Sequence, residues 1–306
     1  MENIKTRLDG LVDQVSQVIL GKETQIRLLI VCLLSRGHGL IEDLPGVGKT
    51  TLAQVLAKVL GLSFQRIQFT SDLLPADILG VSIYDNEARQ FKFHNGPIFA
   101  QMILADEVNR ATPKTQSALL EAMEEQQVTI EGETRYLPKP FFVLATQNPM
   151  HQIGTFPLPE SQLDRFTMRI ELGYPDNQAE RALLKGRDRR DMIDELPVVL
   201  EASELISIQK TLPSVKVTDP LVDYLQAILD FSRRSPQYRM GLSPRAGLSI
   251  LQTSQAWALM EGRDYVVPED VQAVLPGVVG HRLFSISDQQ DPNTLVNQLI
   301  EQVPVP

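Results

Sequence analysis

Residues 40–51 constrain this chain more than any other segment, because they join a strand pattern, a glycine-containing turn and a helix pattern. They read Leu-Ile-Glu-Asp-Leu-Pro-Gly-Val-Gly-Lys-Thr-Thr. The apolar start predicts a strand, Pro45, Gly46 and Gly48 predict a turn, and Lys49 begins the expected helix. Such a turn can direct successive backbone N–H groups at one point, where the helix dipole adds positive charge. The segment therefore predicts an anion-binding site at the end of a strand.

Two side chains after the turn narrow the expected anion to a nucleoside triphosphate. Lys49 has a charge that can reach β- and γ-phosphates, and Thr50 has a hydroxyl that can bind Mg²⁺. The pattern G-x-x-x-x-G-K-[ST] asks for glycine where this chain has Asp43. That position lies at the strand exit, whereas Gly46 and Gly48 approach the phosphate. A chance Gly-Lys-Thr turn is the alternative for this motif alone, and the downstream segments must decide between the two.

Bulk properties exclude several classes of function. The chain has 306 residues, enough for two domains, and a formal net charge of −9, which provides no global basic field for nucleic acid. The single Cys32 rules out an intrachain disulfide, and its apolar surroundings predict a buried side chain. The longest apolar run, at 28–34, is too short for a bilayer span. We therefore expect a cytoplasmic protein without nucleic acid partners or direct membrane insertion.

Strand and helix patterns alternate over the first part of the chain. Helices are expected at 49–60, 76–79 and 113–125, between strand candidates. This alternation predicts a mostly parallel sheet covered by helices on both faces. Ligands of such sheets bind at the carboxyl ends of the strands, where the glycine-containing turn is expected. The strand candidates are 38–42, 64–69, 102–105, 141–146 and 166–172.

Two segments interrupt this alternation with β-hairpin patterns. Residues 81–84 and 91–94 alternate apolar and polar side chains around a polar turn, within the second crossover. Residues 128–130 and 134–137 flank Glu131 and Gly132, just before the fourth strand. Each hairpin either shields the sheet or projects toward a central pore or a partner, and the sequence leaves both interpretations open.

The chain beyond residue 175 shows helical patterns without convincing strands. We predict a nucleotide-binding domain over 1–173 that includes an N-terminal helix, a linker near 173–176 and an all-α domain over 176–283. A C-terminal tail over 284–306 follows, and its last dozen residues are expected to fray. The helix candidates are 178–187, 202–212, 220–234, 244–261 and 268–281.

Polar side chains follow two of the expected strands and predict a catalytic site. Asp106 and Glu107 end the third strand, where Asp106 can hold Mg²⁺ and Glu107 can polarise an attacking water. Asn148 follows the fourth strand, and its amide can contact a γ-phosphate and the water. In isolation, a solvated acidic turn and an Asn-Pro turn are the alternatives. After a phosphate-binding motif, convergence on one triphosphate becomes the favoured interpretation.

Two arginines are candidates for contacting the nucleotide. Arg165 follows Asp164 and can reach a neighbouring subunit's phosphate, the alternative being a surface ion pair. Arg245 lies in the first turn of an expected helix, where the dipole disfavours a cation, so an anionic contact is expected. That anion is either nucleotide or an acidic residue of its own domain. Whether Arg245 acts on its own nucleotide or a neighbour's stays open.

The ordered set of motifs resembles the MoxR family of AAA+ ATPases, in the helix-2-insert clade. The resemblance covers roughly residues 10–283. The segments that carry it read Val-Ile-Leu-Gly-Lys-Glu at 18–23, Leu-Pro-Gly-Val-Gly-Lys-Thr at 44–50, Leu-Ala-Asp-Glu-Val-Asn-Arg at 104–110, Ala-Thr-Gln-Asn-Pro at 145–149, Leu-Pro-Glu-Ser-Gln-Leu-Asp-Arg-Phe at 158–166, Gly-Leu-Ser-Pro-Arg-Ala at 241–246 and Glu-Gly-Arg-Asp-Tyr at 261–265.

The resemblance implies a fold and a set of site residues. The fold would be an α/β, three-layer αβα P-loop domain with two inserted β-hairpins, followed by a smaller all-α lid. The hairpins would be the helix-2 insert and the pre-sensor-1 hairpin. The implied residues are Walker A Lys49 and Thr50 within a loop of Pro45, Gly46, Val47, Gly48 and Thr51, Walker B Asp106 and Glu107, sensor-1 Asn148, arginine finger Arg165, sensor-2 Arg245, and Val18, Ile19 and Gly21 beside the adenine.

The resemblance also implies an activity. It is Mg²⁺-dependent hydrolysis of ATP to ADP that drives chaperone-like remodelling, maturation or assembly of client proteins, sometimes metal-centre insertion, with a von Willebrand factor A-domain partner. An arginine acting in trans implies a homo-oligomeric ring, commonly a hexamer. The alternatives are a nucleic-acid motor of the same clade and a nucleotide-gated scaffold with little turnover. The negative net charge argues against the motor, and the complete set of Glu107, Asn148 and Arg165 argues against the scaffold.

Overall fold

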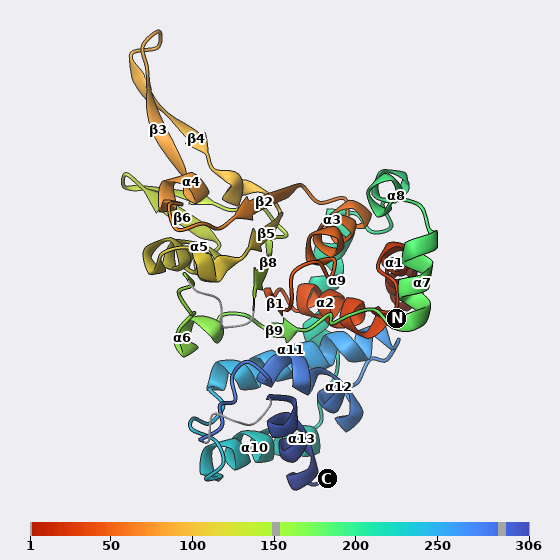
Figure 1. The fold of residues 1–306 in the computed structure, drawn as a ribbon. Helices are drawn as coiled ribbons and strands as arrows, with labels where there is room; N and C mark the ends of the chain where they lie inside the picture. Colours follow the sequence, from red (N-terminus) through yellow and green to blue (C-terminus); the bar gives the residue numbers. More distant parts are fainter. Residues whose placement is uncertain (1, 149–153, 287–291, 306) are drawn as a thin grey trace.

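The computed structural model describes residues 2–148, 154–286 and 292–305, with a parallel sheet at its centre (Figure 1). Pro149, the last residue of the Ala-Thr-Gln-Asn-Pro motif at 145–149, lies outside these ranges. The sheet has five strands in the order β2-β5-β8-β1-β9, all paired in parallel, which confirms the sequence prediction. The strands are β1 (Gly39–Glu42), β2 (Phe64–Gln68), β5 (Met102–Asp106), β8 (Phe142–Gln147) and β9 (Met168–Ile170).

Helices cover both faces of this sheet, so the central strands β5 and β8 are buried at every position. Successive side chains of β5 enter different hydrophobic clusters: Leu104 packs in one and Ile103 in the other. This alternation is the period of a strand between two apolar layers. The helices of this part are α1 (Glu2–Val18), α2 (Glu23–Leu34), α3 (Lys49–Val59), α4 (Pro75–Leu79) and α5 (Pro113–Glu125), with 3₁₀ turns η1 (Pro97–Phe99) and η2 (Val108–Arg110).

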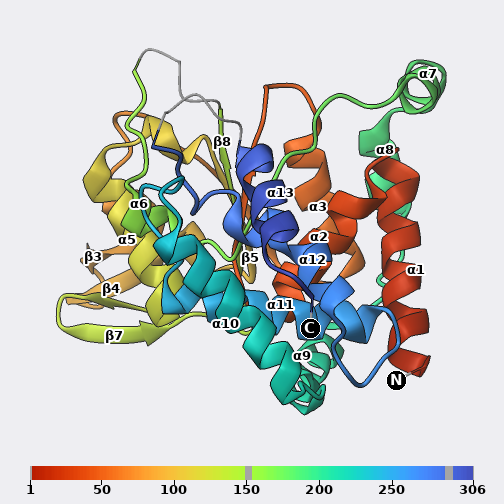
Figure 2. The same cartoon turned by 90° about the horizontal axis from the view of Figure 1, so that it is seen from below.

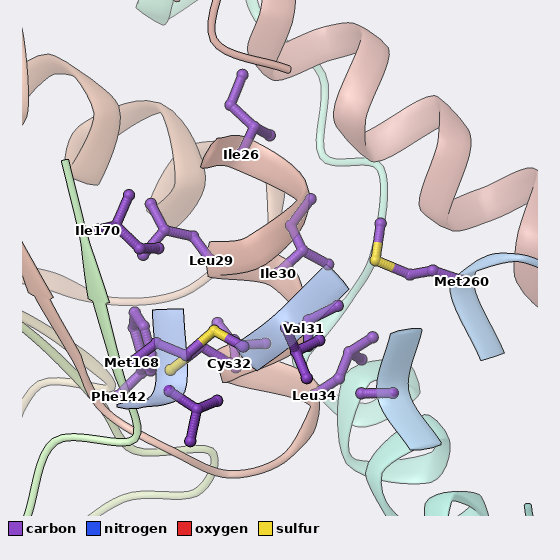
Figure 3. Packing of buried hydrophobic residues seen from close by; sticks show 14 of the residues in the cluster. Ile26, Leu29, Ile30, Val31, Cys32, Leu34, Phe142, Met168, Ile170 and Met260 are labelled. Carbon is purple, nitrogen blue, oxygen red and sulfur yellow. The ribbon is translucent and has the colours of Figure 1, made fainter. Parts of the chain in front are cut away.

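Figure 3 shows the larger cluster, where α2 packs against the edge of the sheet. Leu29 and Cys32 of α2 lie beside Met168 and Ile170 of β9. Cys32 is fully buried, as expected, and burial raises the pKa of its thiol. A protonated, inaccessible thiol is a packing side chain rather than a nucleophile.

Both predicted hairpins form separate two-stranded antiparallel sheets. The first comprises β3 (Gly80–Asp85) and β4 (Gln90–Asn95), and Figure 1 shows it extending well away from the body of the molecule. The second comprises β6 (Gln127–Ile130) and β7 (Glu133–Tyr136) and follows α5. Their role at a pore or a partner stays a prediction.

The helices after β9 lie in two groups. Helices α7 to α9 run beside α1–α3, while α10 to α13 gather beneath the sheet and lie in front of it in Figure 2. No helix in the described residues is long and apolar enough to cross a membrane. The elements are α6 (Glu160–Leu163), α7 (Asn177–Lys185), α8 (Arg189–Glu195), α9 (Ala202–Thr211), η3 (Leu212–Ser214), α10 (Asp219–Arg234), α11 (Pro244–Met260), α12 (Pro268–Val279) and α13 (Pro292–Gln302).

The prediction that the last dozen residues fray is wrong, because most of them belong to α13. Leu295, Val296 and Leu299 share one face of this helix and are buried against the neighbouring helices. The hydroxyl of Tyr238 also donates to the carbonyl of Leu295 at 3.2 Å. The apolar face of α13 therefore outweighs the general tendency of chain ends to fray.

Candidate active site

A pocket of about 300 Å³ lies where β1, β5 and β8 end. These strands are parallel, so the polar residues that follow them meet at one edge of the sheet. The pocket brings together the lysine, both adjacent carboxylates and the asparagine expected from the sequence. Its lining residues are Pro45, Gly46, Gly48, Lys49, Thr50, Thr51, Asp106, Glu107 and Asn148.

The turn before α3 has the backbone conformation that glycine allows. Gly46 and Gly48 have φ angles of 88° and 94°, and an ideal Cβ at either would meet nothing within 4 Å. Conformation, rather than lack of space, therefore requires glycine at both positions in the protein alone. The open side of the turn leaves room for a ligand against the backbone and the start of α3.

Asp43, which replaces the first glycine of the motif, closes the strand exit with its side chain. One carboxylate oxygen accepts from the amide of Leu44 at 2.8 Å, and the other accepts from the amide of Gly173 at 2.6 Å. The carboxylate thus ties the phosphate loop to the segment that follows β9. Asp43, the residue that departs from the motif, therefore has a structural role in this chain.

Lys49 is held at the centre of the pocket by two oxygen atoms. Its Nζ donates to the carbonyl of Asp43 at 2.6 Å and to Oδ1 of Asn148 at 3.2 Å. Burial lowers the pKa of Lys49, and the carboxylates of Asp43, Asp106 and Glu107 oppose that shift. The ammonium therefore lies among groups that favour its charged form, pointed at the place expected for phosphate.

One hydroxyl organises the two adjacent carboxylates. Thr146 Oγ1 donates to Oδ1 of Asp106 at 2.6 Å and accepts from the amide of Glu107 at 2.9 Å. Glu107 has a φ of 57°, in the left-handed region, which costs a non-glycine residue about 1–3 kcal/mol. The Thr146 contact helps to hold this turn, so the carboxylates of Asp106 and Glu107 both face the pocket.

Glu107 and Asn148 are joined across the pocket. Nδ2 of Asn148 donates to Oε1 of Glu107 at 2.9 Å, while Oδ1 of the same amide accepts from Lys49. The other oxygen of Glu107 accepts from Arg110 at 2.9 Å and from Gln68 at 3.0 Å. Asn148 therefore links the ammonium of Lys49 to the carboxylate of Glu107.

Sequence reasoning missed three residues around the carboxylates. The motif at 145–149 predicted no role for Thr146, and no sequence pattern singled out Arg66 or Gln68 of β2. Arg66 pairs with Asp106 at 2.6 Å, and Gln68 contacts Glu107. Pairing of Ala105 with Ala145 places Thr146 beside Asp106, so aligning the ends of neighbouring strands was the signal that could have found it.

The two candidate arginines do not line this pocket. Arg165 donates from Nη1 to the carbonyl of Leu120 at 2.9 Å and pairs with Glu124 at 3.0 Å. Arg245 pairs with the same carboxylate of Glu124. Arg165 precedes β9. Two residues later, the backbone amide of Thr167 donates to the carbonyl of His38, which lies just before β1. Both arginines therefore lie at the amino-terminal edge of the sheet, separated from the pocket by the length of β1, about 13 Å.

The residues expected beside the adenine lie outside the pocket lining as well. Val18 and Ile19 are buried in the main cluster, and Val47 of the loop packs against it. Gly21 has a φ of 68°, and a Cβ there would come within 3.2 Å of Ala179 at the start of α7. Their contact with a nucleotide stays a prediction.

The donor set of the pocket fits a magnesium ion bound together with phosphates. Thr50 provides a hydroxyl and Asp106 a carboxylate, and Mg²⁺ prefers such oxygen ligands while taking others from substrate phosphate and water. Within the described residues, no cluster of three or more His, Cys, Asp or Glu side chains could hold a metal alone. The fit is therefore to a metal that arrives with a nucleotide.

Comparisons with known proteins agree with this geometry. The family model described as "ATPase family associated with various cellular activities (AAA)" matches residues 38–168, and that of the AAA lid domain matches residues 230–303. A crystal structure of a candidate ATPase from Cytophaga hutchinsonii has a TM-score of 0.91 and 34% identity, covering 99% of this chain and 96% of that chain.

Two curated relatives match almost the whole chain. The uncharacterized protein YeaC of Bacillus subtilis is 41% identical over 100% of this chain and 97% of its own length. Chaperone MoxR1 of Mycobacterium tuberculosis is 39% identical over 98% of this chain and 82% of its own length. With the P-loop pocket, the parallel sheet and the helical lid, these full-length likenesses show that the chain belongs to the MoxR family of AAA+ ATPases.

Proposed function

We propose that this ATPase hydrolyses Mg²⁺–ATP in a homo-oligomeric ring, with a hexamer as the expected form. The energy would be used to remodel, mature or assemble client proteins. The observation that carries the proposal is the division of the expected site between two edges of the sheet. The pocket contains Lys49, Glu107 and Asn148, whereas Arg165 and Arg245 lie at the far edge. A complete site would then form only where two subunits meet.

The residues of the pocket can perform most of the chemistry. Backbone N–H groups of the loop and the ammonium of Lys49 would hold the β- and γ-phosphates. Glu107 would orient the attacking water and take up its proton. Asn148 would hold the side chains of Glu107 and Lys49 in fixed positions through its two hydrogen bonds. A bound Mg²⁺, held by Thr50 and Asp106, would neutralise charge on the phosphates.

The arginines support action in trans. Neither lies within side-chain reach of its own pocket, because the strand β1 separates them. In the subunit alone, the carboxylate of Glu124 binds both guanidinium groups. A neighbour's triphosphate carries more negative charge than one carboxylate and would compete for them. We therefore propose that Arg245, like Arg165, acts on the nucleotide of the adjoining subunit.

The client and partner part of the proposal is supported by an exposed surface and a relative. The β3–β4 hairpin extends from the body, and its side chains Ile83 and Phe91 are 52% and 71% exposed. Apolar side chains gathered on a projecting element indicate a contact surface. The relative from Mycobacterium tuberculosis is named a chaperone. We propose client proteins, including metal-centre enzymes, and a von Willebrand factor A-domain partner, in the reducing cytoplasm that the single Cys32 suits.

Mixing two inactive variants tests the shared site. Glu107→Gln subunits keep Arg165, and Arg165→Ala subunits keep Glu107, so equal mixing should create complete sites at about a quarter of the interfaces. We expect phosphate release to be low for each variant and to recover in the mixture. No recovery, in a mixture shown by light scattering to be oligomeric, would overturn the proposal of a finger acting in trans.

A trapping experiment tests the client part. The Glu107→Gln protein should remain on its client in ATP, so purification from its native cells should recover a von Willebrand factor A-domain protein. The Lys49→Ala protein is the matched control, because it should not bind the nucleotide that drives capture. Equal recovery with both variants, or recovery with neither, would contradict nucleotide-dependent partner binding.

A further inference from the structure

Arg282 is a buried charged side chain that lies outside the catalytic pocket. It follows α12, and only 4% of its side chain is exposed. Each of its five N–H groups has an acceptor, which is the full capacity of a guanidinium. Nε donates to Asp164 Oδ1 at 2.7 Å, Nη1 to the carbonyls of Thr167 at 3.1 Å and of Val278, and Nη2 to the carbonyls of Asp164 at 3.1 Å and of Phe166 at 2.7 Å.

These acceptors surround the arginine-finger candidate in the sequence. Asp164 precedes Arg165, and Phe166 and Thr167 follow it. Arg282, just after α12 in the lid domain, therefore donates hydrogen bonds to the main chain on both sides of Arg165. His281, the residue before Arg282, adds a bond from Nε2 to the carbonyl of Phe166 at 2.9 Å. The backbone that carries Arg165 is therefore fixed by two consecutive side chains of the lid.

Asp164 connects the same network to the second arginine. The hydroxyl of Ser243 lies 3.3 and 3.2 Å from the two oxygens of the Asp164 carboxylate, and it also caps α11 by accepting from the amide of Ala246 at 3.1 Å. Nη1 of Arg245, in the first turn of α11, is 3.9 Å from Asp164. The carboxylate of Asp164 thus connects the start of α11 to residues 164–167 around Arg165, which we call the finger segment.

Stability alone does not account for this arrangement. A buried guanidinium loses its hydration, and well-packed apolar side chains at such positions are often as stable or more so. An apolar residue would not fix the orientation of the four carbonyls and the carboxylate that accept from Arg282. The network specifies geometry around Arg165 and Arg245, the two groups that the proposed function assigns to a neighbour's nucleotide.

We propose that Arg282, through Asp164, is a positioning residue that presents Arg165 and Arg245 together to the adjoining subunit. The inference rests on the proposed action in trans. Its consequence is that the lid and the finger segment move as one unit. A subunit lacking Arg282 should keep its own nucleotide pocket, which lies at the other edge of the sheet, yet serve its neighbour poorly.

The test compares two kinds of mixed ring, which place Arg282→Gln either in the subunit that donates the finger or in the subunit that accepts it. In the first mixture, Glu107→Gln/Arg282→Gln subunits donate the finger to Arg165→Ala subunits. In the second mixture, Arg165→Ala/Arg282→Gln subunits accept the finger of Glu107→Gln subunits. Misplacement of a catalytic group by 1 Å can cost about a hundredfold in rate. We expect the first mixture to lose about tenfold to a hundredfold of the recovered turnover, and the second to keep it within about twofold.

Several controls separate positioning from damage to the fold. Arg263→Gln removes another lid arginine from a carboxylate pair, with Asp270, and touches no residue of the finger segment, so it should change neither mixture. Asp164→Asn keeps the side-chain size and should act in the same direction as Arg282→Gln, with less risk to folding. Fluorescent ATP titration should give unchanged affinity for the Arg282→Gln protein.

The outcomes are distinct. Equal losses in the two mixtures, or no loss in either, with Asp164→Asn behaving alike, would overturn the positioning role while leaving action in trans intact. Failure of the parent mixture of Glu107→Gln and Arg165→Ala would instead overturn the proposed function and, with it, this inference. A loss confined to the finger-donating subunit supports both.

Discussion

Replacing Glu107 by glutamine should slow hydrolysis while leaving the pocket assembled. Glutamine has nearly the same size, and its side-chain oxygen can still accept from Asn148, as the carboxylate does at 2.9 Å. It cannot take up a proton from the attacking water. General base catalysis typically contributes about 10²–10⁴ in rate. At about 1.4 kcal/mol for each factor of ten, the barrier should rise by roughly 3–5 kcal/mol.

Nucleotide affinity should change little in the same variant. Glu107 makes its contacts with Asn148, Arg110 and Gln68, whereas the loop and Lys49 are expected to hold the phosphates. Removing a carboxylate near a triphosphate also removes repulsion between like charges. We therefore expect phosphate release at saturating ATP to fall by at least about a hundredfold. Fluorescent ATP titration should give an affinity that is unchanged or tighter.

Arg110→Gln is the matched control for Glu107→Gln. It removes a partner of the same carboxylate, but the Arg110 side chain is 51% exposed, and surface pairs contribute about 1 kcal/mol or less. Its turnover should stay within about fivefold of the unmodified protein. Equal turnover of Glu107→Gln and the unmodified protein would refute the role of Glu107. A large loss in Arg110→Gln would make Arg110 the next candidate for the catalytic arginine.

Four further changes have definite expected outcomes. Lys49→Ala removes the charge at the pocket centre, so a fluorescent ATP titration should show that nucleotide binding is lost, and retained binding would contradict the role of Lys49. Arg165→Ala should bind ATP normally yet lose about a thousandfold in phosphate release, and unchanged turnover would assign the finger to another residue. Thr146→Val leaves Asp106 and the amide of Glu107 without a partner, so urea unfolding should show a loss of about 1–3 kcal/mol, and an unchanged midpoint would contradict this. Burial lowers the pKa of His38 to about 4, so the unfolded chain binds more protons below pH 6.5 and stability should fall as the pH drops from about 6.5 toward 4. His38→Gln should reduce that slope.

Local patterns were sufficient to predict the sheet and the pocket. The strands are short apolar runs that end in turn or polar residues, so their existence was readable and their bounds differ by one or two residues. Lys49, Asp106 and Asn148 each follow such a run, and parallel pairing then requires them to meet. The convergence of the pocket is a consequence of strand direction.

Contacts between segments that are distant in the chain could not be predicted from the sequence. Glu124 receives Arg165 and Arg245, and Arg282 reaches the chain around Arg165, across separations that no local period encodes. The orientation of the lid decides these pairings. Helix α13 was not predicted for a different reason, because its three buried side chains lie close to the end of the chain, where fraying is the usual expectation.

Strand direction also explains why a single subunit is not sufficient for the proposed mechanism. The phosphate loop must follow the carboxyl end of β1, where the chain leaves the sheet to begin α3. Arg165 precedes β9, which runs parallel to β1 and pairs with it, so it must lie at the opposite edge. Rotating the lid does not remove that separation, because Arg165 belongs to the sheet domain and Arg282 holds its backbone. In the proposed mechanism, Arg165 would therefore act on the phosphate pocket of an adjoining copy, because its position in the sheet keeps it away from the pocket of its own subunit.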